Sequence, residues 1–166
     1  MSVSLELLKS VVQGLADKKF TVATAESCTG GLVAKLLTDF SGASTIFLGS
    51  VVAYSNHAKS KLLGVAPDLL SAHGAVSEAV AAAMAQNVRQ ILGADFGLSI
   101  TGIAGPTGGT ANKPIGTVCF GLASQHCLET FSLLQPLERR AFRDFCAEKS
   151  LQLLKQSLDN LPRSIL

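Results

Sequence analysis

The 166-residue sequence lacks several features that mark whole classes of protein. No apolar run approaches the roughly 18 residues that a membrane-spanning helix needs, and the first residues lack the basic start and apolar middle of a signal peptide. A net charge of +2 is too small to make nucleic acid the expected partner. Charged residues make up only 16% of the chain and apolar residues 48%, which excludes a disordered or coiled-coil chain. We therefore expect a cytoplasmic protein with a single domain over residues 1–166 and with neither a membrane nor a nucleic-acid partner.

The four cysteines show none of the spacings of a redox pair or a zinc site. They form no C-x-x-C pair, and none lies at metal-ligand spacing from the three histidines. Cys119 and Cys146 lie in apolar runs, which is typical of ordinary buried cysteines. Disulfides are not expected in a cytoplasmic protein, and the sequence gives no reason to expect a metal ion or an organic cofactor.

Helical and extended patterns alternate along the chain. Apolar residues spaced three or four apart predict long helices at residues 3–18, 77–92 and 138–158, with shorter ones after residues 31, 55 and 67. Runs rich in β-branched residues predict strands at residues 20–24, 45–54, 95–101, 115–123 and 127–134. The last two strands are consecutive, which favours a hairpin. This order predicts an α/β fold, a three-layer α/β/α single domain on a mixed sheet of about five strands.

Polar loops follow three of these predicted strands. They begin near Ser27, at Tyr54 and at Gly102. Ligands of open α/β sheets bind where the carboxyl ends of the strands meet the loops. We therefore expect the three loops to converge on one pocket.

The first loop contains two candidate nucleophiles. Residues 25–31 (AESCTGG) join a predicted strand to an apolar helix, and such a junction offers free N–H groups and the positive end of a helix dipole. The Ser27 hydroxyl and the Cys28 thiol are both groups that can attack a carbonyl carbon. Serine, threonine and glycine also serve as ordinary helix caps, so the residue types alone do not separate a catalytic turn from a structural one.

The second loop brings a phenol and an amine. Tyr54 is the only tyrosine in the sequence and ends a predicted strand, and Lys59 lies in the first turns of the helix that follows. A lysine can act as the base for a serine if burial lowers its pKa toward neutrality. Tyr54 would then relay a proton or donate to an oxyanion. The alternative is a solvated surface lysine, as most lysines are.

The third loop is rich in glycine. Residues 102–109 hold four glycines and a proline, but they match neither the Walker motif nor G-x-G-x-x-G. Free backbone N–H groups in such a loop can bind an anion, and the alternative is simply a flexible connection. Taken with Thr29, Gly30 and Gly31, this loop favours a substrate that carries a phosphate.

Several segments together resemble the CinA C-terminal domain family, whose stand-alone bacterial members are PncC-type nicotinamide mononucleotide deamidases. The resemblance covers nearly the whole chain in the right order. It rests on residues 24–31 (TAESCTGG), 54–56 (YSN) with Lys59, 73–77 (HGAVS), 99–106 (SITGIAGP) and 113–118 (KPIGTV).

The resemblance implies an activity and a set of roles. Members hydrolyse the carboxamide of nicotinamide mononucleotide to nicotinate mononucleotide and ammonia, a step of pyridine nucleotide salvage, without a cofactor. Ser27 would be the nucleophile, Lys59 its base and Tyr54 a supporting hydroxyl. The residues expected to contact the substrate or its oxyanion are Glu26, Cys28, Thr29, Gly30, Gly31, Gly102, Gly105, Gly109, Arg139 and Arg143.

One departure from the family pattern keeps other functions open. Many members carry a Gly-Asp-Arg triplet before the last helix, where this chain has Leu137, Glu138 and Arg139. A loop of changed shape would fit a nucleotide-binding or regulatory module without turnover, and a purely structural interaction domain is the weakest alternative. Within the enzyme hypothesis, Cys28 is the rival nucleophile. The abundance of alanine and leucine with few charges also suggests a homo-oligomer, such as a dimer.

Overall fold

The computed structural model describes residues 3–161. A short 3₁₀ helix at Ala43–Thr45 precedes the second strand. The strands are β1 (Val22–Glu26), β2 (Phe47–Val52), β3 (Phe96–Gly102), β4 (Thr117–Ala123) and β5 (Leu128–Leu134). The α-helices are α1 (Leu5–Lys18), α2 (Leu32–Thr38), α3 (Asn56–Leu63), α4 (Pro67–His73), α5 (Glu78–Leu92) and α6 (Arg139–Asn160).

The strands form one mixed sheet in the order β2-β1-β3-β4-β5. Strand β1 pairs in parallel with both β2 and β3, whereas β4 is antiparallel to β3 and forms a hairpin with β5. Every residue of β1 is buried, as expected for a central parallel strand covered on both faces. The predicted mixed sheet of five strands is confirmed.

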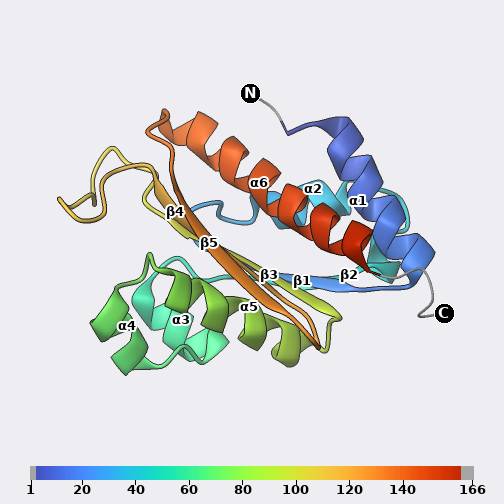
Figure 1. Ribbon diagram of the computed structural model, residues 1–166, viewed down its shortest axis with the longest axis horizontal. Coiled ribbons are helices and arrows are strands. Elements are labelled where there is room, and N and C mark those ends of the chain that lie inside the picture. Colours follow the sequence, from blue (N-terminus) through green and yellow to red (C-terminus); the bar gives the residue numbers. More distant parts are fainter. Residues whose placement is uncertain (1–2, 162–166) are drawn as a thin grey trace.

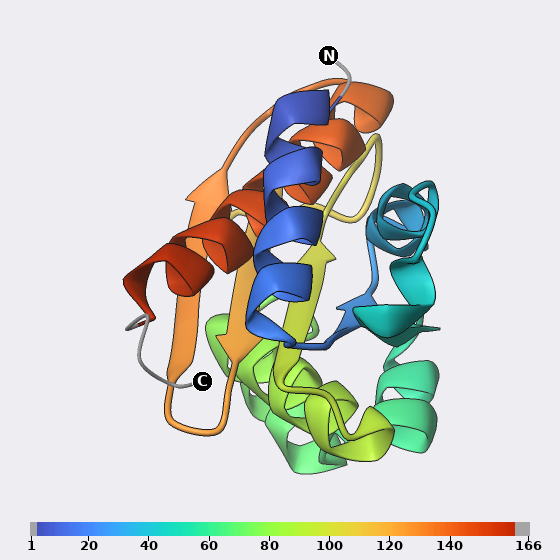
Figure 2. The ribbon, with the colours of Figure 1, turned by 90° about the vertical axis from the view of Figure 1, so that its right-hand side faces the viewer.

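Helices cover both faces of this sheet (Figure 1). Helices α1, α2 and α6 lie on one face, where α1 and α6 pack side by side (Figure 2), and α3, α4 and α5 lie on the other. Two apolar cores fill the layers, one around Leu15, Phe142 and Leu151 and the other around Val80 and Met84. The predicted α/β/α arrangement is therefore also confirmed. No helix in the described part of the chain is long and apolar enough to cross a membrane.

Helix α5 lies unusually close to the centre of the sheet. A side chain at Gly97 would clash with the carbonyl oxygen of Ala85, and one at Gly121 would lie 2.6 Å from the carbonyl oxygen of Ala81. The Ser99 hydroxyl donates to the same Ala81 oxygen at 2.6 Å. Glycines in neighbouring strands thus let the helix backbone approach the strands, and this approach fixes the position of α5 on the sheet.

Strand β1 extends two residues further than its sequence predicts. Ala25 and Glu26 were expected in the loop, but they pair with Val51 and Val52 of β2 and with residues of β3. A glutamate is a poor candidate for a buried central strand unless its carboxylate has partners. Here it has them, because both carboxylate oxygens accept hydrogen bonds from the start of α2. Ser27 is consequently the first residue beyond the strand.

Candidate active site

The loops that follow β1, β2 and β3 meet at one edge of the sheet, because parallel strands end on the same side. The Ser27 N–H donates to the Ile100 carbonyl of β3 at 2.9 Å, and the Ala53 N–H donates to the Glu26 carbonyl at 2.8 Å. A side chain built on Gly102 would lie 3.1 Å from the Cys28 sulfur. The backbone therefore brings the three loops together around Ser27.

Lys59 and Ser27 are in direct contact. The Lys59 Nζ lies 2.9 Å from the Ser27 Oγ and 2.9 Å from the Ala53 carbonyl oxygen. Only 2% of Lys59 and 7% of Ser27 is exposed. Lys59 faces inward because α3 begins at Asn56, where the Ser55 hydroxyl caps it by accepting from the Ala58 N–H at 3.0 Å. The alternative of a solvated surface lysine is wrong.

The surroundings of Lys59 favour its unprotonated form. Burial lowers the pKa of the Lys59 amine from its usual range, and the nearby Cys28 thiol acts more weakly in the opposite direction. The ion pairs found within residues 3–161 are Lys35–Asp39 and Lys155–Asp159, so no carboxylate holds the charge of Lys59. A neutral amine beside a hydroxyl can remove the proton of that hydroxyl.

The Glu26 carboxylate is turned toward α2 and away from solvent. Glu26 is fully buried, and its oxygens accept from the N–H groups of Gly31 at 3.0 Å, Val33 at 3.2 Å and Ala34 at 2.9 Å. The expected free N–H groups at the start of α2 are therefore already occupied. Over residues 3–161, the N–H groups of Cys28 and Thr29 make no hydrogen bond to protein, which leaves them as the donors of the turn.

The Cys28 thiol lies in the apolar core. Cys28 is 4% exposed and belongs to the core cluster that also contains Cys146. Its interaction with the Cys146 thiol, together with burial, raises the pKa of Cys146, and burial raises the pKa of Cys119 to about 11. Cys119 and Cys146 are thus neutral buried thiols, as expected. Lys59 hydrogen-bonds to the Ser27 hydroxyl and to a carbonyl, so this geometry favours Ser27 over Cys28 as the nucleophile.

Two arginines of α6 connect the loops. Arg139 donates to the Tyr54 hydroxyl and to the Gly105 carbonyl, both at 2.7 Å, and Arg143 donates to the Thr29 carbonyl at 2.6 Å. The two arginines lie one helical turn apart, and Arg139 is the first residue of the helix despite the missing glycine. The structure therefore places both arginines at the predicted site.

Tyr54 lies at the rim of the site and not beside Ser27. Its side chain is exposed, and the hydrogen bond of its hydroxyl within the described residues is the one with Arg139. Of the three groups expected together, the hydroxyl of Ser27 and the amine of Lys59 form a buried pair, whereas the phenol of Tyr54 lies apart from them. A substrate would have to lie between them for all three groups to act on it.

The glycines of the site have different roles. Gly30 and Gly31 have φ angles of 60° and 91°, which other residues rarely adopt, so the turn after Thr29 requires them. A side chain on Gly109 would lie 2.8 Å from the Ile115 nitrogen, which shows that Gly109 packs within its own loop. Gly105 is buried and presents its carbonyl to Arg139.

Sequence reasoning missed one contributor, and it did not foresee the unpaired hydroxyl of another, Thr29. The Ala53 carbonyl binds the lysine amine, and a backbone carbonyl leaves no signal in a sequence. The Thr29 hydroxyl is fully buried and, among the described residues, has no hydrogen-bond partner. Its unpaired state could not be predicted, because it depends on how the turn folds against α6.

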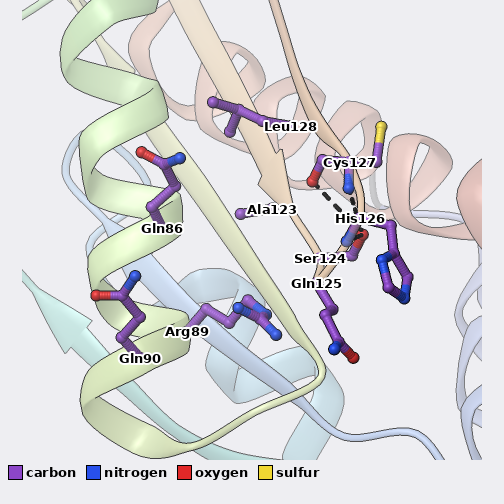
Figure 3. A pocket seen from close by; sticks show the side chains of 9 residues that line it. All are labelled: Gln86, Arg89, Gln90, Ala123, Ser124, Gln125, His126, Cys127 and Leu128. Carbon is purple, nitrogen blue, oxygen red and sulfur yellow. Dashed lines mark hydrogen bonds between the residues drawn. The ribbon is translucent and has the colours of Figure 1, made fainter.

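A polar hollow of about 340 Å³ lies elsewhere on the molecule (Figure 3). Helix α5 and the β4–β5 hairpin form it, with Gln86, Arg89, Gln125 and His126 among its lining residues. Gly97 at the start of β3 pairs with Ala123, so this hairpin lies at the opposite end of the strands from Ser27. The hollow is not part of the site. No group of three or more histidine, cysteine or acidic side chains within residues 3–161 could hold a metal ion.

Comparison with known proteins identifies the family. The model of the CinA C-terminal domain matches residues 4–158. This chain belongs to the CinA C-terminal domain family. The resemblance found in the sequence is confirmed.

Relatives of the family share both sequence and fold with this chain. A CinA-like protein of Mycobacterium tuberculosis is 51% identical over 144 residues, which are 86% of this chain and 34% of the relative. One from Desulfosudis oleivorans is 46% identical over 155 residues, 93% of this chain and 38% of the relative. The chain thus spans little more than a third of the length of these curated relatives.

Solved structures of similar proteins cover the chain almost completely. The competence damage-inducible protein A (ComA) from Klebsiella pneumoniae has a TM-score of 0.91 at 30% identity, covering 95% of this chain and 98% of its own. The competence/damage inducible protein CihA from Agrobacterium tumefaciens has a TM-score of 0.89 at 34% identity, covering 93% of this chain and 94% of its own.

Proposed function

We propose that this protein is an amidohydrolase that converts nicotinamide mononucleotide and water to nicotinate mononucleotide and ammonia. The observation that carries the proposal is the buried contact between the Lys59 amine and the Ser27 hydroxyl. The residues support serine-based hydrolysis of an amide, and the resemblance to the deamidases supplies the substrate.

The proposed reaction has two halves. Unprotonated Lys59 takes the proton of Ser27, and the Ser27 Oγ attacks the carboxamide carbon to form a tetrahedral intermediate. Lys59 then gives that proton to the amide nitrogen, the C–N bond breaks, and ammonia leaves an ester on Ser27. Water loses a proton to Lys59 and attacks the ester, and the proton returns to the Ser27 oxygen as the carboxylic acid leaves.

The N–H groups of Cys28 and Thr29 are the proposed oxyanion donors. The other N–H groups at this helix start are taken by the Glu26 carboxylate or by backbone carbonyls, whereas these two have no protein partner in the described structure and directly follow the nucleophile. Removing one oxyanion donor typically lowers the rate by about 100- to 1,000-fold. The buried Thr29 hydroxyl is a further donor within the same turn.

We assign the phosphate of the substrate to Arg139 and Arg143, which together form a cationic rim of the site. Arg139 and Arg143 come from one face of α6 and reach the glycine loop and the Ser27 turn, respectively. A guanidinium binds phosphate through two parallel hydrogen bonds, which also fixes the orientation of the ligand. Gly105 and Tyr54, which Arg139 contacts, and Gly102, which lies beside Cys28, complete the proposed substrate contacts.

Ammonia release from nicotinamide mononucleotide by the purified protein tests the proposal. We expect activity in the wild type and its loss, by at least 100-fold, in both Ser27→Ala and Lys59→Met, with the fold intact by circular dichroism. Lys61→Met changes an exposed lysine of the same helix and is the matched control. An active Ser27→Ala variant would contradict the assignment of the nucleophile.

Thiol alkylation separates Ser27 from Cys28. The experiment is best done in a Cys127→Ser background, because Cys127 is exposed and would consume reagent. If Ser27 is the nucleophile, the Cys28→Ala variant should be active, and treatment with the alkylating reagent should not lower its activity. Loss of activity in Cys28→Ala with retained activity in Ser27→Ala would assign the reaction to the thiol.

The second candidate is a nucleotide-binding module without turnover. Two observations favour it: Leu137 and Glu138 stand where many family members have Gly-Asp, and Arg139 donates to the Gly105 carbonyl and the Tyr54 hydroxyl. Calorimetry with nicotinamide mononucleotide distinguishes the two functions. Saturable binding without ammonia release would support the binding module, whereas turnover would exclude it.

A further inference from the structure

We infer that Glu26 is a positioning residue whose carboxylate acts as a built-in anion at the start of α2 and so fixes the turn that carries Ser27. This inference rests on the proposed function for its kinetic readout. It gives Glu26 a role different from the direct substrate contact expected for it in the sequence.

The contacts of Glu26 are those of an anion bound at a helix start. Its side chain is fully buried, and its two oxygens receive three N–H groups, from Gly31, Val33 and Ala34, at 2.9 to 3.2 Å. Backbone N–H groups and the helix dipole together stabilise a negative charge at such a place. No ion pair with an arginine or lysine balances this carboxylate in the described structure. The three N–H groups at the start of α2 and, at 3.4 Å, the Thr24 hydroxyl supply the compensation.

The same residue joins the sheet to the helix on either side of the nucleophile. The Glu26 backbone belongs to β1, and its carbonyl accepts from the Ala53 N–H of the loop after β2. Its side chain holds Gly31, the residue directly before α2. The Glu26 side chain therefore keeps the end of β1 and the start of α2 at a fixed separation, and the turn from Ser27 to Gly30 connects these two points.

This link determines where the reacting groups can lie. The Ser27 Oγ and the free N–H groups of Cys28 and Thr29 all belong to the turn, whereas Lys59 belongs to α3. If the carboxylate is removed, the start of α2 can move relative to β1, and the turn moves with it. A displacement of about 1 Å between reacting groups can lower a rate by about 100-fold.

The carboxylate also limits where the substrate can bind. A phosphate cannot use the N–H groups at the start of α2, because Glu26 occupies those of Gly31, Val33 and Ala34 and its charge would repel a second anion. The Glu26 oxygens bond to the start of α2, whereas the Lys59 amine bonds to Ser27 and Ala53, so the two side chains share no hydrogen bond in the described structure. Glu26 therefore acts on the site through geometry and not as a counter-ion of the base.

Chemical rescue of a truncated variant tests this role. Glu26→Ala opens a space beside three N–H donors that formate can fill. We expect kcat to fall by about 100-fold with KM changed less than threefold, and we expect sodium formate to restore a substantial part of kcat in a saturable manner. Sodium chloride at the same ionic strength should restore nothing. Glu6→Ala, which removes an exposed carboxylate from the first turn of α1, is the matched control and should keep wild-type kcat.

Thermal unfolding provides a readout that does not need activity. Formate should raise the Tm of Glu26→Ala more than that of the wild type, whose site is filled. If Glu26→Ala does not fold, Glu26→Gln takes its place, and kcat should fall without a change in KM because an amide NH₂ would face an N–H donor.

The outcomes separate this inference from the proposed function. A raised KM with unchanged kcat would show direct substrate contact, and retained kcat or a loss that formate does not change would overturn the positioning role. A wild-type protein without deamidase activity would refute the proposed function, and the effect of formate on the Tm of Glu26→Ala would then decide the inference alone.

Discussion

A lysine amine that meets a hydroxyl and a carbonyl, and no carboxylate, loses hydration without gaining an ion pair. Lys59 is in this position, since within residues 3–161 its Nζ forms hydrogen bonds with Ser27 and Ala53 alone. The unfavourable burial of its charge is the physical source of the lowered pKa, and in the proposed mechanism the lowered pKa lets the amine act as a base. The burial that lowers the pKa of Lys59 should therefore also lower the free energy of unfolding.

The pH dependence of stability should report this cost. The folded pKa of Lys59 is lower than its unfolded value of about 10.4, so between these values the unfolded chain binds more protons. The free energy of unfolding of the wild type should therefore rise relative to Lys59→Met as the pH increases toward 10.4, by about 1.4 kcal/mol per pH unit within that window. Urea unfolding at pH 7 and pH 10 measures the difference. Parallel pH profiles for the two proteins would contradict a lowered pKa.

Thr29 should show the same exchange of stability for function. Its buried hydroxyl has no partner in the described structure, and an unsatisfied buried polar group costs about 1–3 kcal/mol. Thr29→Val should therefore raise the free energy of unfolding by about 1 kcal/mol and lower kcat/KM for nicotinamide mononucleotide. Thr24→Val is the matched control. The Thr24 hydroxyl donates to Ser50 at 2.8 Å and lies 3.4 Å from a Glu26 oxygen, so that change should destabilise the protein. Unchanged activity in Thr29→Val would remove Thr29 from the substrate contacts.

At the scale of the elements, the sequence predicted the order of helices and strands because each has a local signal. Apolar spacing marks α1, α5 and α6, and Ser55 and Ser77 stand directly before α3 and α5, where their hydroxyls cap the helix starts. The extra length of β1 had no such local signal. Glu26 is tolerated in a buried strand only because its carboxylate contacts α2, which lies further along the chain. Local patterns predict elements, but they do not predict which buried charges find partners.

The close approach of α5 to the sheet can be tested with two glycines of opposite expected effect. Gly121→Ala places a methyl group 2.6 Å from the Ala81 carbonyl and should destabilise the protein by about 1–3 kcal/mol. Gly14→Ala lies inside α1, where the new methyl meets Leu158 at an ordinary 3.5 Å, and should stabilise it by about 0.5–1 kcal/mol. Chemical unfolding measures both. Equal effects would show that α5 can move away from β4 at little cost.

At the scale of the whole molecule, the site is assembled from distant parts of the chain. Lys59 lies 32 residues from Ser27, and Arg143 lies 114 residues from Thr29. Sequence reasoning located the three loops because parallel strands end at one edge, and motif resemblance selected the residues within them. The link between Arg139 and Tyr54 was not predicted, because 85 residues separate the two and neither carries a local signal for the other.

The homodimer expected from the composition stays a prediction. Its physical basis is the exposed apolar side chains of the two edge strands, Leu48 and Val52 on β2 and Leu128 and Leu134 on β5. Light scattering coupled to size exclusion should give twice the chain mass of 17.2 kDa. A mass equal to one chain at micromolar concentration would contradict the prediction.

The central claim is that Lys59 is unprotonated where it meets Ser27, and titration of its amine by NMR tests this most directly. Labelled lysine side chains would be followed from pH 5 to 11, with Lys59→Met used to assign the signal. We predict a Lys59 pKa below 10.5 that coincides with the pH at which kcat/KM for nicotinamide mononucleotide reaches half its maximum. A Lys59 amine that titrates at 10.5 or above would contradict it.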